Sequence, residues 1–173
     1  MVNIPEPSLY SLGIIKNIWN TSFGQTISCI FEFGARYGED SIAMSTLFPN
    51  SRIISFECNP NTLDQCRNNI YNKPRIRLIE AAIGNYDGKV KFYPINKERT
   101  ITSWKDGNQG ASSVFRSSGN YPIEQYFQDE IEVPIVTASK IIQELGIEEI
   151  DLLWMDIQGA ELMALEGFKD KLA

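Results

Sequence analysis

Three acidic residues lie at the ends of expected strands, and in parallel sheets the residues at the carboxyl ends of the strands commonly bind ligands and catalyse reactions. Glu32 precedes a Gly-x-x-x-Gly turn at residues 34–38, Glu57 ends the next apolar segment, and Asp156 ends the apolar segment DLLWM. The chain contains no histidine. Proton transfer must therefore fall to Asp, Glu, Lys, Tyr or water, and histidine-based zinc sites and Ser-His-Asp or Cys-His catalysis are excluded.

The glycine turn and Glu57 together predict a nucleoside site. Gly34 and Gly38 allow close approach of a ligand to the backbone and a positive φ. Glu57 follows Gly34 by 23 positions, a spacing at which a carboxylate accepts hydrogen bonds from both hydroxyls of a ribose. A tight strand–helix turn and a solvated acid at a strand end are the alternative interpretations.

Asp156 is expected at the same edge of the sheet as the glycine turn and Glu57. Its carboxylate suits a ligand's amino group, a metal ion or a proton, and capping of a helix that begins near Gly159 is the structural alternative. Glu161 follows in the first turn of that helix, where the helix dipole favours a negative charge. Because only two acids converge here, we expect no metal site, although a divalent metal that lowers a hydroxyl pKa is an alternative.

The elements that would position these residues alternate along the chain. The patterns predict strands at 26–34, 52–57, 75–84, 89–95, 131–138 and 149–157, and helices at 8–22, 38–48, 59–72, 139–147 and 159–173. Apolar strands that alternate with helices predict an α/β fold with a mostly parallel sheet and helices on both faces. Ligands bind such sheets at the carboxyl ends of the strands.

Local signals predict several element boundaries. Asn59 is expected to cap a helix that starts with Pro60. Pro134 predicts that its strand lies at an edge or a bulge. Ser139 is a candidate cap for the helix that Gly146 ends.

Residues 96–122 have no clear period and predict a long loop. Long loops on such scaffolds often carry specificity, and this one is expected to lie over the cleft. A mobile surface loop is the alternative interpretation. Its side chains suited to a sugar-like acceptor are Trp104, Asn108, Gln109, Ser112, Ser113 and Arg116.

Composition limits the function classes. The 173 residues suit one domain, with a helical segment at 1–27 and the ligand-binding domain at 28–173. The net charge of -6 lacks the basic character that phosphate backbones require, so no nucleic-acid partner is expected. Neither a membrane span nor a secretory signal is expected. Cys29, Cys58 and Cys66 fit no disulfide or zinc pattern and predict free thiols in the cytoplasm.

Four segments in this order resemble the successive motifs of FkbM-family methyltransferases. They are FEFGARYGEDS, FECNPNT, AAIGNYDGKVKFYP and, most specifically, IDLLWMDIQGAELMALEG. The resemblance covers roughly residues 28–170. It implies a Rossmann-like class I methyltransferase fold that binds S-adenosyl-L-methionine.

The resemblance also implies roles for single residues. Gly34, Ala35 and Gly38 would line the methionine end of the cofactor, where Glu32 stands in place of the more usual Asp. Glu57 would hold the ribose. Cys58, Asn59 and Ala82 would lie beside the adenine. Asp156 would face the methionine end and the acceptor.

The implied reaction is O-methylation of a hydroxyl on a sugar, a glycan or a natural product, with Asp156 or Glu161 as the base. A non-catalytic Rossmann-like binding protein that retains the nucleoside site is the alternative. A dehydrogenase is disfavoured because no Gly-x-Gly-x-x-Gly is present. The family fold normally continues with three more strands where this sequence ends, and a truncated chain, a minimal variant and a sheet completed by a partner are the alternatives. An open sheet edge would favour association of copies.

Overall fold

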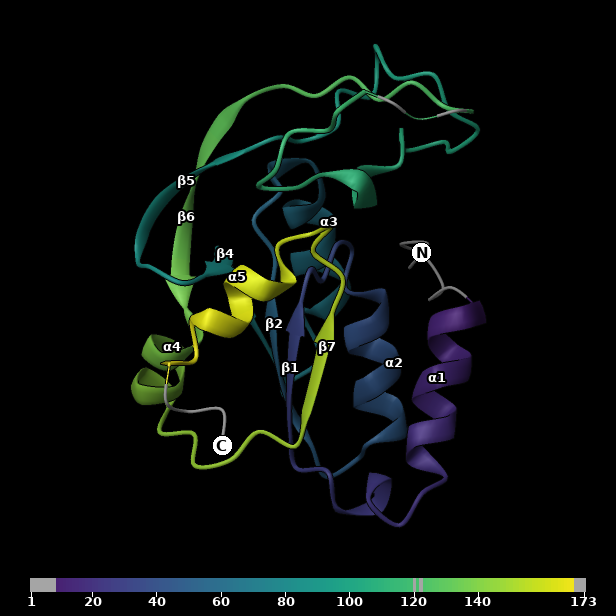
Figure 1. Cartoon of the computed structure of the whole chain (residues 1–173). Helices are drawn as coiled ribbons and strands as arrows, with labels where there is room; N and C mark the ends of the chain where they lie inside the picture. The colour runs from purple at the N-terminus through teal and green to yellow at the C-terminus, as the bar shows by residue number, and fades with distance from the viewer. Residues whose placement is uncertain (1–8, 120, 122, 170–173) are drawn as a thin grey trace. The chain divides into compact units, whose positions relative to one another are not determined.

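The computed structural model describes residues 9–119, 121 and 123–169. These residues form two compact units (Figure 1). Unit 1 contains the described residues up to Glu57, together with Thr62–Glu80 and Ile147–Met155. Unit 2 contains Cys58–Asn61, Ala81–Gly146 and the described residues from Asp156 onward.

Unit 1 is built on a four-stranded parallel sheet. Its strand order is β3 (Ile76–Ile79), β2 (Arg52–Phe56), β1 (Cys29–Phe33) and β7 (Leu152–Met155). Phe33 lies opposite both Phe56 and Met155, so the carboxyl ends of three strands stand level. Among the described residues β7 pairs with β1 alone, and its four residues are half-buried.

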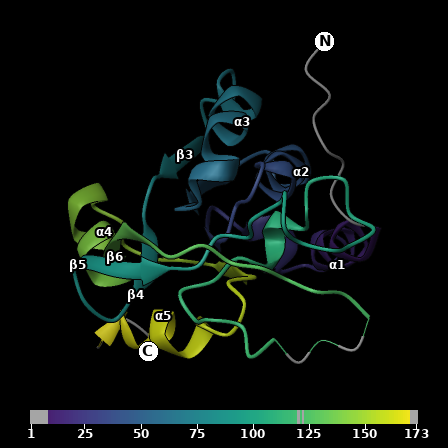
Figure 2. The same cartoon turned by 90° about the horizontal axis from the view of Figure 1, so that it is seen from above.

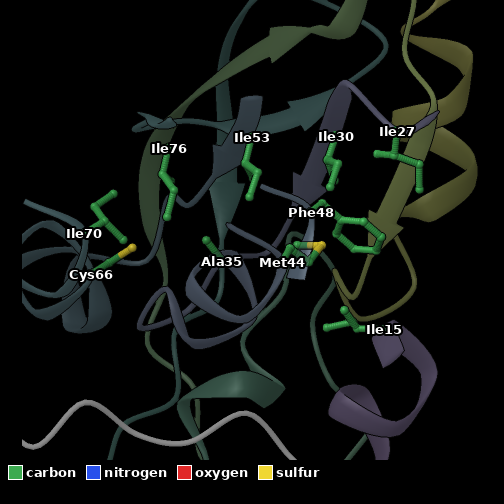
Figure 3. Close-up of a cluster of buried hydrophobic side chains, with 10 residues drawn as sticks. All are labelled: Ile15, Ile27, Ile30, Ala35, Met44, Phe48, Ile53, Cys66, Ile70 and Ile76. Atoms are coloured by element: carbon green, nitrogen blue, oxygen red, sulfur yellow. The ribbon is translucent and has the colours of Figure 1, made fainter. Parts of the chain in front are cut away.

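Three helices pack on one face of this sheet. They are α1 (Leu9–Trp19), α2 (Glu39–Leu47) and α3 (Pro60–Ile70), and α1 and α2 lie side by side (Figure 1). Figure 3 shows Ile30, Ile53 and Ile76 in a row across three strands, where they contact apolar side chains of the helices. The alternation of side chains along each strand turns Phe31, Phe33 and Phe56 to the other face, where their rings are in contact and buried.

Unit 2 is built on a three-stranded mixed sheet (Figure 2). β6 (Ile131–Thr137) runs parallel to β4 (Ala82–Gly84) and antiparallel to β5 (Gly88–Phe92). The helix α4 (Ala138–Leu145) follows β6 directly, and α5 (Glu161–Glu166) packs against β4. The α/β class with a mostly parallel sheet flanked by helices is therefore confirmed. Within the described part of the chain no helix is long and apolar enough to span a bilayer.

The single strand predicted at 75–84 was wrong. The chain pairs with β2 up to Ile79 and then leaves that sheet, because β2 ends at Phe56. It resumes at Ala82 as β4, which pairs with β6 in the other sheet. An apolar run cannot reveal such a change of partner, because both strands are apolar.

Two predicted boundaries were also wrong. Pro134 belongs to the central strand of its sheet and not to an edge strand. Proline has no backbone N–H to donate to a neighbouring strand. Pro134 is tolerated because it pairs only with Lys89 of β5, and pairing with β4 on the other side begins one residue later, at Ile135. The cap of α4 is Thr137, whose hydroxyl accepts a hydrogen bond from the Lys140 amide, and not Ser139.

Other boundaries agree with the sequence. The Asn59 side chain accepts a hydrogen bond from the Asn61 amide and caps α3, which starts at Pro60. Gly146 ends α4 in the left-handed conformation. The last predicted helix is shorter than expected, because α5 covers only Glu161–Glu166, and residues 170–173 lie outside the described part.

Candidate functional site

The turn after β1 has the left-handed backbone that its glycines predicted. Gly34 has φ 90°, Gly38 has φ 82°, and Arg36 between them has φ 51°. The amides of Gly34 and Ala35 both donate to the Phe56 carbonyl, at 3.0 and 2.9 Å. The turn is thus fixed to the end of β2, with its backbone bent back on itself.

The helix α3 supports this turn from the side. A Cβ on Gly38 would lie 2.9 Å from Cγ2 of Ile70 and 3.4 Å from Sγ of Cys66, so only glycine fits without movement. The Asn69 side-chain amide donates to the Tyr37 carbonyl at 2.8 Å. Asn69 could not be predicted as part of the turn, because a buried amide within a helix has no distinctive spacing.

Glu57 lies at the turn, as its position at the end of β2 predicted. Its side chain is only 8% exposed, and Oε2 accepts a 2.6 Å hydrogen bond from the Arg36 amide. An ionised carboxylate accepts about four hydrogen bonds, and the Arg36 amide is one of the partners of Glu57. The structure thus brings Gly34, Ala35, Gly38 and Glu57 together in unit 1.

The Glu32 side chain contacts α2. It lies opposite Ser55 in the sheet, accepts a hydrogen bond from the Ser41 hydroxyl, and is 1% exposed. Ser41 and Ser55 hydroxyls lie 3.0 Å apart, which closes a small buried polar cluster. Burial raises the pKa of Glu32 to about 7, against the lowering effect of the two serines. Its expected contact with a cofactor stays a prediction.

Further charged groups surround the start of α2. Glu39 accepts a hydrogen bond from the Tyr37 amide at 2.9 Å and lies 3.6 Å from the Arg36 guanidinium. Burial raises the pKa of Glu39. The Trp154 indole donates to Asp40 at 3.0 Å, which links β7 to α2.

In unit 2, Asn59 has a structural role in addition to its cap. Its side-chain amide donates to Gln109 at 3.3 Å and to Ser112 at 3.1 Å, and all three side chains are buried. Cys58 and Ala82 belong to an apolar cluster with residues of β5 and β6. Their expected positions beside an adenine stay predictions.

The chain turns sharply after β7. Asp156 is exposed, and Oδ1 accepts a 2.6 Å hydrogen bond from the Gln158 side chain. Glu161 is engaged by the backbone: Oε1 accepts from the amides of Ile157 at 3.2 Å and Gly159 at 3.3 Å. Across the described residues no group of three or more Cys, Asp or Glu side chains forms a metal-binding cluster.

The predicted 96–122 loop is anchored at several points. Ser113 is bridged to Tyr93, and Ile101 to Gln125. Asn108 donates to the Tyr126 hydroxyl at 2.8 Å. Trp104 is exposed, whereas the Arg116 guanidinium lies 5.5 Å above the Tyr93 ring.

Comparison with known proteins gives consistent matches. The 2-O-methyltransferase NoeI of Sinorhizobium fredii (strain NBRC 101917 / NGR234) is 31% identical over 147 residues, which cover 83% of this chain and 58% of that protein. Methyltransferase 1 of Beauveria bassiana (strain ARSEF 2860) is 26% identical over 151 residues, which cover 83% of this chain and 59% of that protein. The chain thus spans about three fifths of the length of these relatives.

A solved precorrin-6y C5,15-methyltransferase from Geobacter metallireducens GS-15 shares 24% identity, with a TM-score of 0.37 over 45% of this chain and 44% of that one. Residues 32–173 match the methyltransferase FkbM domain, which is most of the chain. The chain therefore belongs to the FkbM methyltransferase family.

Proposed function

We propose that this chain carries the S-adenosyl-L-methionine site of an O-methyltransferase that acts on a hydroxyl of a sugar, a glycan or a natural product. Family membership supports methyl transfer, and similarity to the 2-O-methyltransferase NoeI supports an oxygen acceptor. The observation that carries the cofactor assignment is the buried Glu57 carboxylate, which is held 2.6 Å from the Arg36 amide of the glycine turn.

The residues of unit 1 fit this cofactor. Glu57 is acceptor-only when ionised, as two ribose hydroxyl donors require. Gly34 and Gly38 both have a positive φ, a conformation that glycine adopts without a steric cost. We propose that Ala35 and the two glycines line the methionine end, and that Cys58, Asn59 and Ala82 lie toward the adenine.

S-adenosylmethionine supplies an electrophilic methyl group on a positively charged sulfonium. The contribution of the protein is to hold donor and acceptor in line at near-attack distance, which can be worth roughly 7–11 kcal/mol. We propose that Asp156 receives the hydroxyl proton, directly or through water, which can add a factor on the order of 100 to 10,000. Glu161, which already binds two backbone amides, holds the turn that presents Asp156.

The test is calorimetric titration of the protein with S-adenosylmethionine and S-adenosylhomocysteine. Hydrogen bonds to charged groups contribute about 1.5–3 kcal/mol each, so loss of two ribose contacts in Glu57→Ala is expected to weaken binding by at least about 100-fold. The exposed Glu144→Gln on α4 is the matched control. A folded wild-type protein that binds neither compound would refute the cofactor assignment.

A non-catalytic binding protein is the second candidate. The hydrogen bonds that Glu161 accepts from the Ile157 and Gly159 amides favour this second function, because they leave Asp156 as the single proposed base. An acceptor screen of sugars and polyketide-like alcohols with methyl-labelled cofactor separates the two functions. Binding without any labelled product favours the binding protein, and a labelled methyl ether supports the enzyme.

The described part of 28–173 would act as one methyltransferase domain after the N-terminal segment 1–27, of which the structure describes residues 9–27. Copies would associate through the β7 edge, which pairs with β1 alone among the described strands. Sedimentation equilibrium with the edge variant Leu153→Lys tests association, because a charge on an edge strand opposes pairing.

A further inference from the structure

The turn at residues 156–159, here called the Asp156 turn, has a demanding backbone. Gln158 has φ 53° and Gly159 has φ 97°, both in the left-handed region. A residue with a side chain adopts that region only when its surroundings hold it there. The contacts that hold Gln158 therefore also determine where its side chain places the Asp156 carboxylate.

The amides of the turn are held by Glu161, whose Oε1 accepts from Ile157 and Gly159. The Gln158 side chain in turn donates to Oδ1 of Asp156 at 2.6 Å. The backbone carbonyl of Gln158 is bound by Ser113, a residue of the 96–122 loop that is distant in sequence.

The Ser113 hydroxyl donates to the Gln158 carbonyl at 3.0 Å and accepts a hydrogen bond from the Phe115 amide at 3.0 Å. Ser113 is 5% exposed, so water competes little for these bonds. The Phe115 ring lies 3.8 Å from the position that a Cβ on Gly159 would occupy, so loop and turn also touch there.

Ser113 is itself a fixed point, because the segment before it is anchored in a buried polar network. Gln109 donates to the Ile95 carbonyl at 3.0 Å, and the Ser112 hydroxyl accepts from the Ile95 amide at 3.0 Å. Asn59 donates to both Gln109 and Ser112. The Ser113 carbonyl accepts from the Tyr93 amide at 2.8 Å, which completes the attachment.

We propose that Ser113 is a positioning residue for Asp156, acting through Gln158. We call Ser113, Gln158 and Asp156 the Ser113 relay. The Ser113 hydroxyl holds the Gln158 carbonyl, and the Gln158 side chain holds the Asp156 carboxylate, which the proposed function assigns to the cofactor and the acceptor. The functional consequence rests on the proposed function, whereas the restraint on the turn does not.

The experiment is a double-mutant cycle with the cofactor as probe. The variants are Ser113→Ala, Ser113→Thr, Gln158→Ala and Asp156→Asn, and the exposed loop variant Ser103→Ala is the matched control. Calorimetric titration with S-adenosylmethionine is expected to show a 3- to 10-fold loss of affinity for Ser113→Ala and Gln158→Ala, about the value of one hydrogen bond. Ser113→Thr, which keeps the hydroxyl, and Ser103→Ala are expected to stay within about twofold of wild type.

The double-mutant cycle distinguishes positioning of Asp156 from a nonspecific structural effect of the substitutions. In an Asp156→Asn background, Ser113→Ala and Gln158→Ala are expected to cause no further loss, because they act through the same carboxylate. The same loss in both backgrounds, or wild-type affinity in Ser113→Ala, overturns the relay. Gln158 is exposed, so Gln158→Ala carries the test even where Ser113→Ala does not fold.

A second readout does not depend on the cofactor. Hydrogen exchange at the Gly159 amide is expected to rise at least about 10-fold in Ser113→Ala and to return to the wild-type rate in Ser113→Thr. Unchanged exchange overturns the restraint by Ser113. If the wild-type protein binds no S-adenosylmethionine while this exchange result holds, the proposed function fails and the structural part of the relay stands.

Discussion

Replacement of Glu32 by Gln is expected to stabilise the protein above neutral pH. The Glu32 carboxyl lies between β1 and α2, is 1% exposed, and has the Ser41 hydroxyl as donor. Burial disfavours its charged form, and the nearby acids Asp40 and Glu39 add to the effect. Glutamine has nearly the same shape and a carbonyl that accepts from Ser41, but it carries no charge at any pH.

The size of the effect follows from the pKa. A value raised from 4.5 to about 7 corresponds to about 3 kcal/mol between the neutral and ionised forms. The stability that the neutral acid provides is fully present below pH 4.5 and is lost as the pH rises through 7, because the unfolded chain has already released the proton. Between pH 5.5 and 8.5 we expect the wild type to lose about 2 kcal/mol relative to Glu32→Gln.

The assay is urea unfolding of both proteins at half-unit intervals from pH 5.5 to 8.5, followed by circular dichroism. The difference between the two free energies of unfolding cancels the titration of all other groups that the substitution leaves unchanged. Glu144→Gln, on the exposed side of α4, is expected to give a difference that does not vary with pH by more than a few tenths of a kcal/mol. Parallel curves for wild type and Glu32→Gln would show that Glu32 is ionised in the folded protein at pH 5.5, and the reasoning would be wrong.

Three further substitutions test the packing that positions the site. Gly38→Ala requires an alanine in the left-handed conformation and places its Cβ 2.9 Å from Ile70. We therefore expect thermal unfolding to show a stability loss of about 1–3 kcal/mol, together with weaker cofactor binding. An unchanged melting temperature would contradict the tight fit. Gly13→Ala, in the interior of α1 with open space around its Cβ, is expected to gain about 0.5–1 kcal/mol in the same assay, and a loss would mean that α1 packs more closely there. Thr137→Ala removes the cap of α4 and is expected to cost about 1 kcal/mol, whereas Thr137→Ser restores most of it.

Local chemistry explains which elements could be predicted. Asn59 and Pro60 mark the start of α3 because a side-chain acceptor and a fixed φ act within a few residues. Gly146 marks the end of α4 for the same reason. The Thr137 cap was missed because Thr137 and Ser139 both carry a hydroxyl, and only the path of the chain decides which one faces the helix amides.

In the candidate site, too, some residues could be predicted from local sequence and others could not. Glu57 and the glycine turn were predicted from spacing, because strand ends in a parallel sheet stand level whatever their sequence. The roles of Glu161 and Ser113 were not, because each depends on a contact with backbone groups of a turn. Glu161 was expected to act as a base or to compensate the helix dipole, and the structure shows its carboxylate on two amides.

The sequence by itself determined the alternation of strands and helices, the resemblance to the FkbM family, and the acids at the strand ends, because these follow from periodicity and from motifs within short segments. Only the tertiary structure decided that residues 75–84 divide between two sheets, that Glu32 is buried under α2, and that Ser113 holds the Asp156 turn. Each of these depends on which distant segment supplies the partner. A hydrogen bond across 45 residues leaves no periodic trace in the chain.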